Sequence, residues 1–383
     1  MDELDAAMEI LSQGPQLAID TEFIREKTFF PQIALIQLAN HEQTWLLDPL
    51  EFNRDSLTSF LDLMRNPKVL KVMHAAFADQ EVLYWSYGVT AEPMLDTSVA
   101  AALVGLGDSV GLGTLTRDVL GIKLPKGLAR AKWLSRPISP ELVEYAAMDV
   151  AHLLALSDAL CEKLKTKDRM QWALEASVVP EAAFDTPPED IAKKISKSGH
   201  LDGKTCAVLL ELVKWREARA KDVDLPRNWV SDNETLRAIA KVKPKSRQEL
   251  SQFRGLNKRE YQKEGDTILD CIRRGLSQPP LDWKRGPGLP IPSDDDNRAT
   301  DLLKAYVNYL CTEHSIAPRF VLSGNRFYRL LLSANESPDV WVEKDILSEN
   351  ACRLLSKDLV SFLHGKRGLS LEGKKVKVLG MED

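Results

Sequence analysis

The sequence predicts a mixed α/β domain that is followed by two helical units. Short apolar runs alternate with segments of helical spacing in the first half of the chain, which is typical of a sheet flanked by helices. From residue 204 to residue 275, apolar residues recur only at helical spacing. A proline-rich stretch at residues 278–296 then precedes a third unit with the same helical pattern. The 383 residues, 44% of them hydrophobic, suffice for two or three domains.

The elements of the first domain follow from their apolar patterns. Four short apolar runs indicate strands, and a turn at residues 40–43 makes the second and third of them neighbours. These strands are expected at residues 16–20, 33–39, 44–47 and 69–73. Helical spacing indicates five helices, with Ser56 and Ser139 as capping residues and Pro140 in a first turn. The helices are expected at residues 56–64, 79–87, 97–106, 112–120 and 140–165.

Composition argues against several classes of protein. No apolar run approaches the roughly 18 residues that a membrane-spanning helix needs, and the acidic start at residues 1–3 is unlike a signal peptide. We therefore expect a cytoplasmic protein that does not bind a membrane. The five cysteines lie far apart and form no CxxC pair, so neither a disulfide framework nor a zinc site is expected.

Charge is distributed unevenly along the chain. The formal net charge is -5, yet Lys and Arg outnumber Asp and Glu by about nine between residues 193 and 285. The rest of the chain is therefore strongly acidic. A basic segment beside an acidic domain is typical of a polyanion-binding module joined to a domain that uses carboxylates. The alternative is an ordinary solvated helical surface.

Three separate signals place carboxylates at the ends of elements. Asp20 and Glu22 end an apolar strand on one face, about 7 Å apart along the backbone. Tyr145 and Asp149 have i, i+4 spacing, which places the phenol beside the carboxylate on one helix face. Asp79 follows a predicted strand, where it could simply cap a helix. Each signal taken singly has a simpler explanation. Asp20 and Glu22 could lie at the rim of the sheet, Tyr145 and Asp149 could be a solvent-exposed pair, and Asp79 could be a helix cap.

Taken together, the four carboxylates match the needs of a two-metal phosphodiester site. Two cations roughly 3.5 to 4 Å apart stabilise the attacking and leaving oxygens of an in-line displacement. Hard cations such as Mg²⁺ bind carboxylate oxygens, and an all-oxygen site suits Mg²⁺ or Mn²⁺. The hydroxyl of Tyr145 could position or deprotonate the attacking water.

Three segments resemble, in wording and order, the exonuclease motifs of the tyrosine subclass of the DEDD superfamily. The first is AIDTEFIREKTFFPQIALIQLA, the second is HAAFADQEVL, and the third runs from GLGTLTRDVL to EYAAMDVAHLL. Residues 209–256 resemble an HRDC domain, and the C-terminal third is similar to a second, divergent HRDC domain. This combination resembles the bacterial ribonuclease D family over nearly the whole chain.

The resemblance implies a ribonuclease-H-like fold, a mixed sheet flanked by helices, followed by two all-α HRDC-like domains. It implies stepwise 3′ to 5′ hydrolysis of RNA with two divalent metal ions, Mg²⁺ or Mn²⁺, releasing nucleoside 5′-monophosphates. Asp20, Glu22, Asp79 and Asp149 would be the metal ligands, with Asp20 bridging both ions. Tyr145 would orient or activate the water. None of the five positions departs from the family pattern.

The resemblance also implies the domain limits and the partners. The exonuclease domain would cover residues 1–185, the HRDC domain 200–280 and the divergent second HRDC-like domain 297–383. The implied RNA substrates are tRNA precursors and other small structured RNAs, and we expect a monomer. A DNA 3′ exonuclease of repair is an alternative, because a two-metal site does not itself select the sugar. A catalytically silent RNA-binding scaffold is a second alternative, against which the intact carboxylate and tyrosine set argues.

Four further residues are candidate RNA contacts. Phe23 could stack on an unpaired 3′ base, although burial is the usual state of an aromatic side chain. His74 could lie near the scissile phosphate or donate to a strand-end carbonyl. Lys126 and Arg130 fit a substrate-side loop, although residues 126–128 are less polar than the family pattern.

Other motifs carry no chemistry. Glycine pairs at residues 105–107 and 111–113 look like phosphate loops, but Val110 stands where GxGxxG needs its third glycine and no GxxxxGK[ST] occurs. No nucleotide cofactor is therefore expected. Asp48 and Asp96 are expected to be turn or capping residues.

Overall fold

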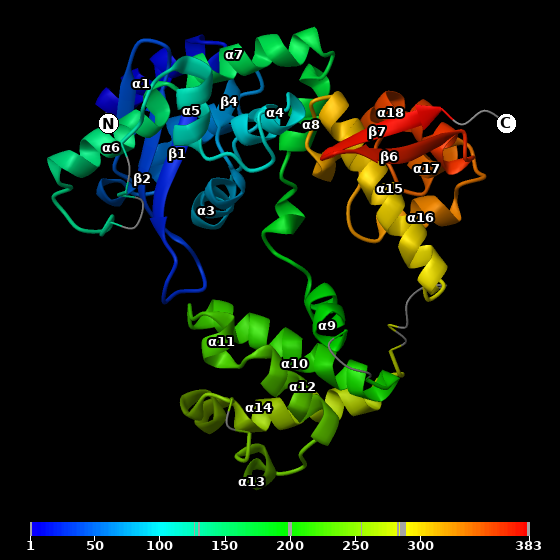
Figure 1. The fold of residues 1–383 in the computed structure, drawn as a ribbon. Coiled ribbons are helices and arrows are strands. Elements are labelled where there is room, and N and C mark those ends of the chain that lie inside the picture. The colour runs from blue at the N-terminus through cyan, green and yellow to red at the C-terminus, as the bar shows by residue number, and fades with distance from the viewer. Residues whose placement is uncertain are drawn as a thin grey trace.

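The computed structural model describes residues 2–125, 127–128, 131–197, 201–253, 255–281, 283 and 289–380. In Figure 1 a central sheet with helices around it is followed by a helical unit and then by a third unit that ends in a hairpin. The predicted succession of a mixed α/β domain and helical units is therefore confirmed. None of the described helices is long and apolar enough to cross a membrane.

The sheet places β1, its first strand in sequence, at the centre, with two strands on each side. Its strands are β1 (Gln16–Ile24), β2 (Gln32–Ala39), β3 (Thr44–Leu47), β4 (Leu70–Met73) and β5 (Met94–Asp96). The spatial order is β3-β2-β1-β4-β5, and β1 pairs antiparallel with β2 but parallel with β4. The register puts Asp20 opposite Gln37 and Glu22 opposite Leu35, with an irregularity between Glu22 and Phe23. All four predicted strands are confirmed, and the central strand is the one that carries Asp20.

Alternation along β1 separates the two layers that cover the sheet. Leu17 and Ile19 pack in a core with α1 (Asp2–Gln13), α2 (Thr58–Arg65) and α3 (Phe77–Tyr87). Ala18 and Leu35 pack on the other face, in cores shared with α6 (Pro140–Ala151) and α7 (Leu153–Thr166). Because side chains two residues apart share a face, Asp20 and Glu22 point to the α6 side.

The helices of this domain differ from expectation at their ends. The predicted helix at residues 140–165 is two helices, α6 and α7, which are separated at His152. Ser139 caps α6 as predicted and accepts from the N–H of Leu142. Ser56 caps nothing, because a 3₁₀ turn precedes α2 and that helix begins at Thr58. The remaining helices are α4 (Thr97–Leu103), α5 (Leu112–Leu120) and α8 (Met170–Ser177).

The second unit is helical, as its spacing predicts. It contains α9 (Pro188–Ser196), α10 (Gly203–Asp222), α11 (Arg227–Val230), α12 (Asn233–Val242), α13 (Arg247–Leu250) and α14 (Lys258–Ser277). The described part of residues 204–275 holds no strand, only an isolated bridge between Ser231 and Leu256. Apolar residues of α10, α12 and α14 form its core, including Leu212, Ile239 and Ile268.

The third unit needs two corrections. It contains α15 (Asp294–Glu313), α16 (Arg326–Leu332), α17 (Pro338–Glu343), α18 (Glu349–Leu363), β6 (Arg367–Glu372) and β7 (Lys375–Gly380). The all-helical expectation is wrong for its last residues, because β6 and β7 form an antiparallel hairpin around Gly373 at φ +62°. The acidic run at residues 294–296, expected in the linker, forms the first turn of α15. Ser293 makes a capping box with Asp296 there, and carboxylates are favourable at a helix N-terminus.

The third unit shares one hydrophobic core with the first, mixed α/β domain. Residues of α15 such as Leu303 pack together with Leu103 and Leu160 of the first domain. The buried guanidinium of Arg169 donates to the carbonyls of Leu103, His314 and Ser315 at 2.6 to 3.0 Å. These two parts of the chain, far apart in sequence, therefore lie side by side (Figure 1).

The second unit is attached to the sheet through the loop between β1 and β2. Figure 1 shows this hairpin reaching from the sheet toward α11. Phe29 in the loop is only 2% exposed and packs in the core of the second unit. Asp224 accepts the N–H groups of Phe29 and Phe30 at 2.9 and 3.0 Å, and the Arg227 guanidinium lies 4.5 Å from the Phe29 ring centroid. A core residue and a carboxylate thus dock the helical unit on the strand pair that carries Asp20.

Removing the Phe29 side chain should release the second unit from the sheet. A large-to-small change at a buried aromatic costs about 3–5 kcal/mol. We expect Phe29→Ala to increase the radius of gyration in small-angle X-ray scattering, and Asp224→Ala to do so to a smaller degree. Asp222→Ala is the matched control, because that carboxylate is exposed and bonded to Arg219 within its own helix. An unchanged radius of gyration in Phe29→Ala would contradict this docking role.

Candidate active site

Strand β1 positions Asp20 and Glu22 on the face that α6 covers. The apolar residues before them are fully buried on both faces, which fixes the strand register and the direction of both carboxylates. Glu22 is 9% exposed, whereas Asp20, Tyr145 and Asp149 stay partly accessible. The site is thus buried at its base and open on one side.

Helix α3 brings Asp79 to this strand. The hydroxyl of Thr21 donates to Oδ1 of Asp79 at 2.5 Å, and Asp79 is 8% exposed. Asp79 lies within the first turn of α3, whose capping position is Ala76 without a side-chain cap. The alternative that Asp79 caps the helix is therefore wrong, since its carboxylate is held by the strand.

The start of α3 is fixed by a different carboxylate. Asp96 accepts the N–H groups of Ala75 and Ala76 at 2.9 and 3.0 Å, and the N–H of Ser98 at 2.8 Å. Ala75 has φ +54°, so this contact holds a strained turn between β4 and α3. Asp96 is the N-cap of α4 and Asp48 caps a 3₁₀ turn, which confirms the capping roles predicted for both.

Helix α6 brings Tyr145 and Asp149 over the sheet. It packs across β1, β2 and β3, with Ala146 fully buried against Leu35. The ring of Trp133 lies 6.1 Å from that of Tyr145, centroid to centroid, and Trp133 is 1% exposed. Trp133 therefore supports the ring of Tyr145 from the core.

The carboxylates of β1, α3 and α6 perturb one another. Burial, with the charges of Asp149 and Asp79, raises the pKa of Glu22 to about 8. Burial raises the pKa of Asp79 to about 6, although the Thr21 hydrogen bond opposes the rise. Burial also raises the pKa of Asp149 to about 6, against a hydrogen bond from Tyr145. The pKa of Asp20 lies well above its usual range, because of burial and then the charges of Asp79, Asp149 and Glu22.

The hydroxyl of Tyr145 lies close enough to these carboxylates to be affected by their charges. Burial and then the charges of Asp149, Glu22 and Asp20 raise the pKa of Tyr145. Three carboxylates near one phenol disfavour its ionised form. The phenol therefore keeps its proton at neutral pH and can act as a hydrogen-bond donor beside the carboxylates.

The chemistry of this donor set fits divalent cations. No Lys or Arg contributes to the pKa of Asp20, Glu22, Asp79 or Asp149 among the described residues. Buried carboxylates without a counter-charge repel one another, and oxygen-binding cations remove that repulsion. In the part of the chain that the structure describes, no three such side chains already surround a single point as metal ligands. The four carboxylates thus act on one another's charge without already forming a closed cage of metal ligands.

The candidate RNA contacts fall in different surroundings. Nδ1 of His74 lies 2.8 Å from Oγ1 of Thr97, and burial lowers the pKa of His74. His74 therefore contacts a threonine hydroxyl of α4, which in turn donates to the strand-end carbonyl of Met73. Phe23 is partly buried and packs against the core on the α1 side of the sheet. Lys126 and Arg130 lie outside the described residues.

Sequence reasoning missed Thr21. Strand alternation points Thr21 away from Asp20 and Glu22, toward the layer that contains α3, and its hydroxyl reaches Asp79 there. The available signal was the hydroxyl residue between two carboxylates in a strand. Which helix lies on its face follows only from the packing.

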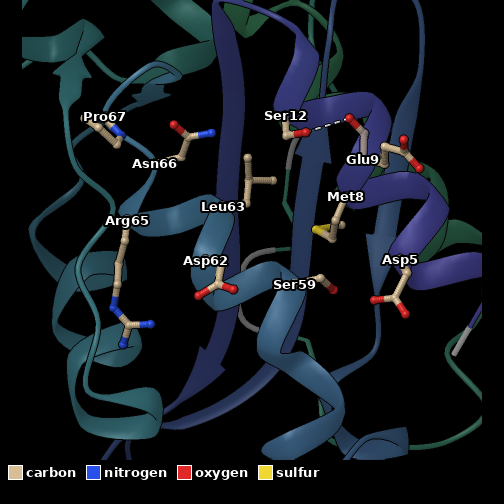
Figure 2. A pocket seen from close by; sticks show the side chains of 10 residues that line it. All are labelled: Asp5, Met8, Glu9, Ser12, Ser59, Asp62, Leu63, Arg65, Asn66 and Pro67. Carbon is tan, nitrogen blue, oxygen red and sulfur yellow. Dashed lines mark hydrogen bonds between the residues drawn. The ribbon is translucent and has the colours of Figure 1, made fainter.

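A pocket elsewhere on the first domain is not part of this site. Its volume is about 580 Å³, and it lies between α1 and α2 on the opposite face of the sheet (Figure 2). Asp5, Glu9 and Asp62 give its wall an acidic character, with Arg65 as a single basic residue. This lining offers little to a polyanion.

The raised carboxyl pKa values predict that the metal-free protein loses stability with rising pH. Folding keeps protons on groups that the unfolded chain releases near pH 4, so stability falls as pH rises toward the folded values of about 6 to 8. We expect the melting temperature in EDTA to drop between pH 5 and pH 8, and Asp20→Asn to reduce that drop. The exposed Asp118→Asn should leave it unchanged, and parallel curves for wild type and Asp20→Asn would contradict the electrostatic cause.

Comparison with known proteins agrees with these observations. Residues 1–165 match the family described as 3′-5′ exonuclease, and residues 206–272 match the HRDC domain. The chain is 32% identical to ribonuclease D of Bartonella henselae over 98% of this chain and 91% of that protein. It is 30% identical to ribonuclease D of Gluconacetobacter diazotrophicus over 98% of this chain and 94% of that protein.

A solved structure gives the same result over the whole fold. The crystal structure of Escherichia coli RNase D, described as an exoribonuclease involved in structured RNA processing, superposes with a TM-score of 0.78 at 27% identity. The match covers 95% of this chain and 96% of that one. The mixed sheet, the helical HRDC region and full-length relatives therefore agree with the resemblance in the motifs. This chain belongs to the ribonuclease D family and is a 3′-5′ exoribonuclease.

Proposed function

We propose that this exoribonuclease holds two divalent cations, Mg²⁺ or Mn²⁺, through Asp20, Glu22, Asp79 and Asp149. The observation that carries the proposal is the burial of these carboxylates beside one another without a described basic partner. Bound divalent cations stabilise negative charge on the attacking and leaving oxygens of a phosphodiester. The carboxylates would thus hold the ions at the open side of the site, where the end of an RNA has access.

In this proposal Tyr145 orients the attacking water. Its hydroxyl keeps a proton because burial and the nearby carboxylates raise its pKa, so it is a hydrogen-bond partner of fixed position. The buried ring of Trp133 beside it and the packing of α6 on the sheet restrict its movement. A positioned water reacts faster because less orientational freedom remains to be lost.

We further propose that the HRDC region supplies RNA affinity that the acidic site lacks. Lys241, Lys258 and Lys263 of this region are exposed to solvent. Phosphate contacts by such residues provide affinity without sequence preference. Phe23, His74, Lys126 and Arg130 are the proposed contacts nearer the cleaved end, although the described contacts of His74 favour structure.

The proposed substrates are tRNA precursors and other small structured RNAs, processed in the cytoplasm by a monomer. A relative is described as involved in structured RNA processing, which supports this substrate class. The proposed domains are the exonuclease at residues 1–185, the HRDC domain at 200–280 and a divergent HRDC-like domain at 297–383. Similar helix content in the last two units supports a common origin, although the terminal hairpin belongs to only one of them.

Single substitutions should separate metal binding from water positioning. With 5′-labelled RNA, wild type should yield a descending single-nucleotide ladder that requires Mg²⁺ or Mn²⁺. Asp149→Ala should abolish the ladder, and Tyr145→Phe should slow it by about 100-fold or more with little change in Mn²⁺ affinity measured by calorimetry. Asp118→Ala serves as the control, because this exposed carboxylate pairs only with Arg117 among the described residues. A metal-independent ladder would overturn the proposal, and an equal ladder on DNA would argue against RNA as the preferred substrate.

Charge reversal in the HRDC region should lower RNA affinity and its salt dependence. The test is a triple variant, Lys241→Glu, Lys258→Glu and Lys263→Glu, in the full-length chain. Truncation after residue 185 is unsuitable, because it would expose the core that the first domain shares with α15. Loss of three phosphate contacts should reduce the slope of log affinity against log salt by about 2. Equal slopes in the variant and wild type would contradict the proposed division between binding and cleavage.

A further inference from the structure

A buried amide lies directly opposite the central carboxylate of the site. Gln37 on β2 is fully buried, and neither its Oε1 nor its Nε2 has a hydrogen-bond partner among the described residues. Buried polar groups are almost always paired, because an unmade hydrogen bond costs about 1–3 kcal/mol. An unpaired amide at the centre of a sheet therefore calls for a partner.

Within the sheet, the strand register offers Gln37 one polar neighbour. Gln37 pairs with Asp20 of β1 on one side and with Leu46 of β3 on the other. Directly opposed residues point to the same face, with Cβ atoms about 4.5–5.5 Å apart. The neighbours of Gln37 along its own strand and face are Leu35 and Ala39, both buried and apolar. Asp20 is thus the polar residue that lies directly opposite Gln37 in the sheet on this face.

We infer that Gln37 is a positioning residue, whose side-chain N–H donates to the Asp20 carboxylate when that carboxylate holds divalent cations. The inference rests on the proposed role of Asp20 as a ligand. Carboxylates that bind metal ions are commonly oriented by a hydrogen bond from a second residue. A glutamine suits this position because its amide donates without adding a charge to a site that already holds four carboxylates.

The chain contains a contrasting buried glutamine. Gln80 of α3 is 2% exposed, donates to the carbonyl of Ala91 at 3.0 Å and accepts the N–H of Ala91 at 2.8 Å. Its amide has an architectural role that needs no ligand. The two glutamines should therefore respond differently to replacement by methionine, which has a similar length and no amide.

The test compares Gln37→Met with Gln80→Met and Leu38→Met in the full-length protein. In EDTA, Gln37→Met should melt at or above the wild-type temperature, since an unpaired amide is removed, whereas Gln80→Met should melt lower. In metal-binding calorimetry with MnCl₂ and no RNA, Gln37→Met should bind at least 10-fold more weakly than wild type. Leu38→Met, on the opposite face of the same strand, should bind Mn²⁺ as wild type does. In an RNA-cleavage assay, Gln37→Met should also have a lower kcat than wild type, while its KM for RNA stays within about twofold.

Each result separates the inference from the proposed function. If wild type binds Mn²⁺ and Gln37→Met binds it equally well, the positioning role is overturned and the metal site stands. If wild type itself does not bind Mn²⁺, the proposed metal site fails first. Should Gln37→Met not fold, the side-chain amide signal of Gln37 in wild-type ¹⁵N spectra decides the matter. It should shift when Mg²⁺ is added, and a signal that stays in place would overturn the inference.

Discussion

The repulsion among four neighbouring carboxylates, two buried and two half-buried, is the constraint on which the rest of the structure depends. Burial raises the pKa of Asp20, Glu22, Asp79 and Asp149, and the charges of neighbouring carboxylates raise the pKa of Asp20 and Glu22 further. The four groups must therefore be held together by forces from elsewhere. The buried β1 core on both faces, the Thr21 hydrogen bond and the α6 packing supply those forces. The fold therefore keeps a destabilising charge cluster in place, as is common where stability yields to function.

The same strand pair connects the acidic site with the helical unit that follows it. Strand β1 carries Asp20 and Glu22, and the loop after it inserts Phe29 into the core of the HRDC region. Asp224 fixes that loop through two backbone N–H groups. The third unit is joined differently, through a continuous core and Arg169. Both later units are thus attached to the exonuclease domain by its own elements and not merely by linkers.

Errors in the sequence interpretation arose where local signals compete. Three consecutive aspartates indicate a linker by composition, yet Ser293 and the helix dipole make them a good first turn for α15. Asp79 satisfies the pattern of a cap, but Asp96 fixes the start of α3 instead. The terminal hairpin has few apolar residues and a single glycine turn, a weak signal beside the strong helical periodicity before it.

The sequence by itself determined the class of each unit, four strands of the sheet and the acidic residues that the site brings together. These features depend on periodicities of two and 3.6 residues and on motifs of fixed spacing, which are local properties of the chain. Only the tertiary structure decided that Thr21 holds Asp79, that Gln37 faces Asp20 without a partner and that Phe29 is a core residue of another unit. Such contacts join residues from 17 to nearly 200 positions apart, and no local pattern encodes which distant surface a side chain will meet.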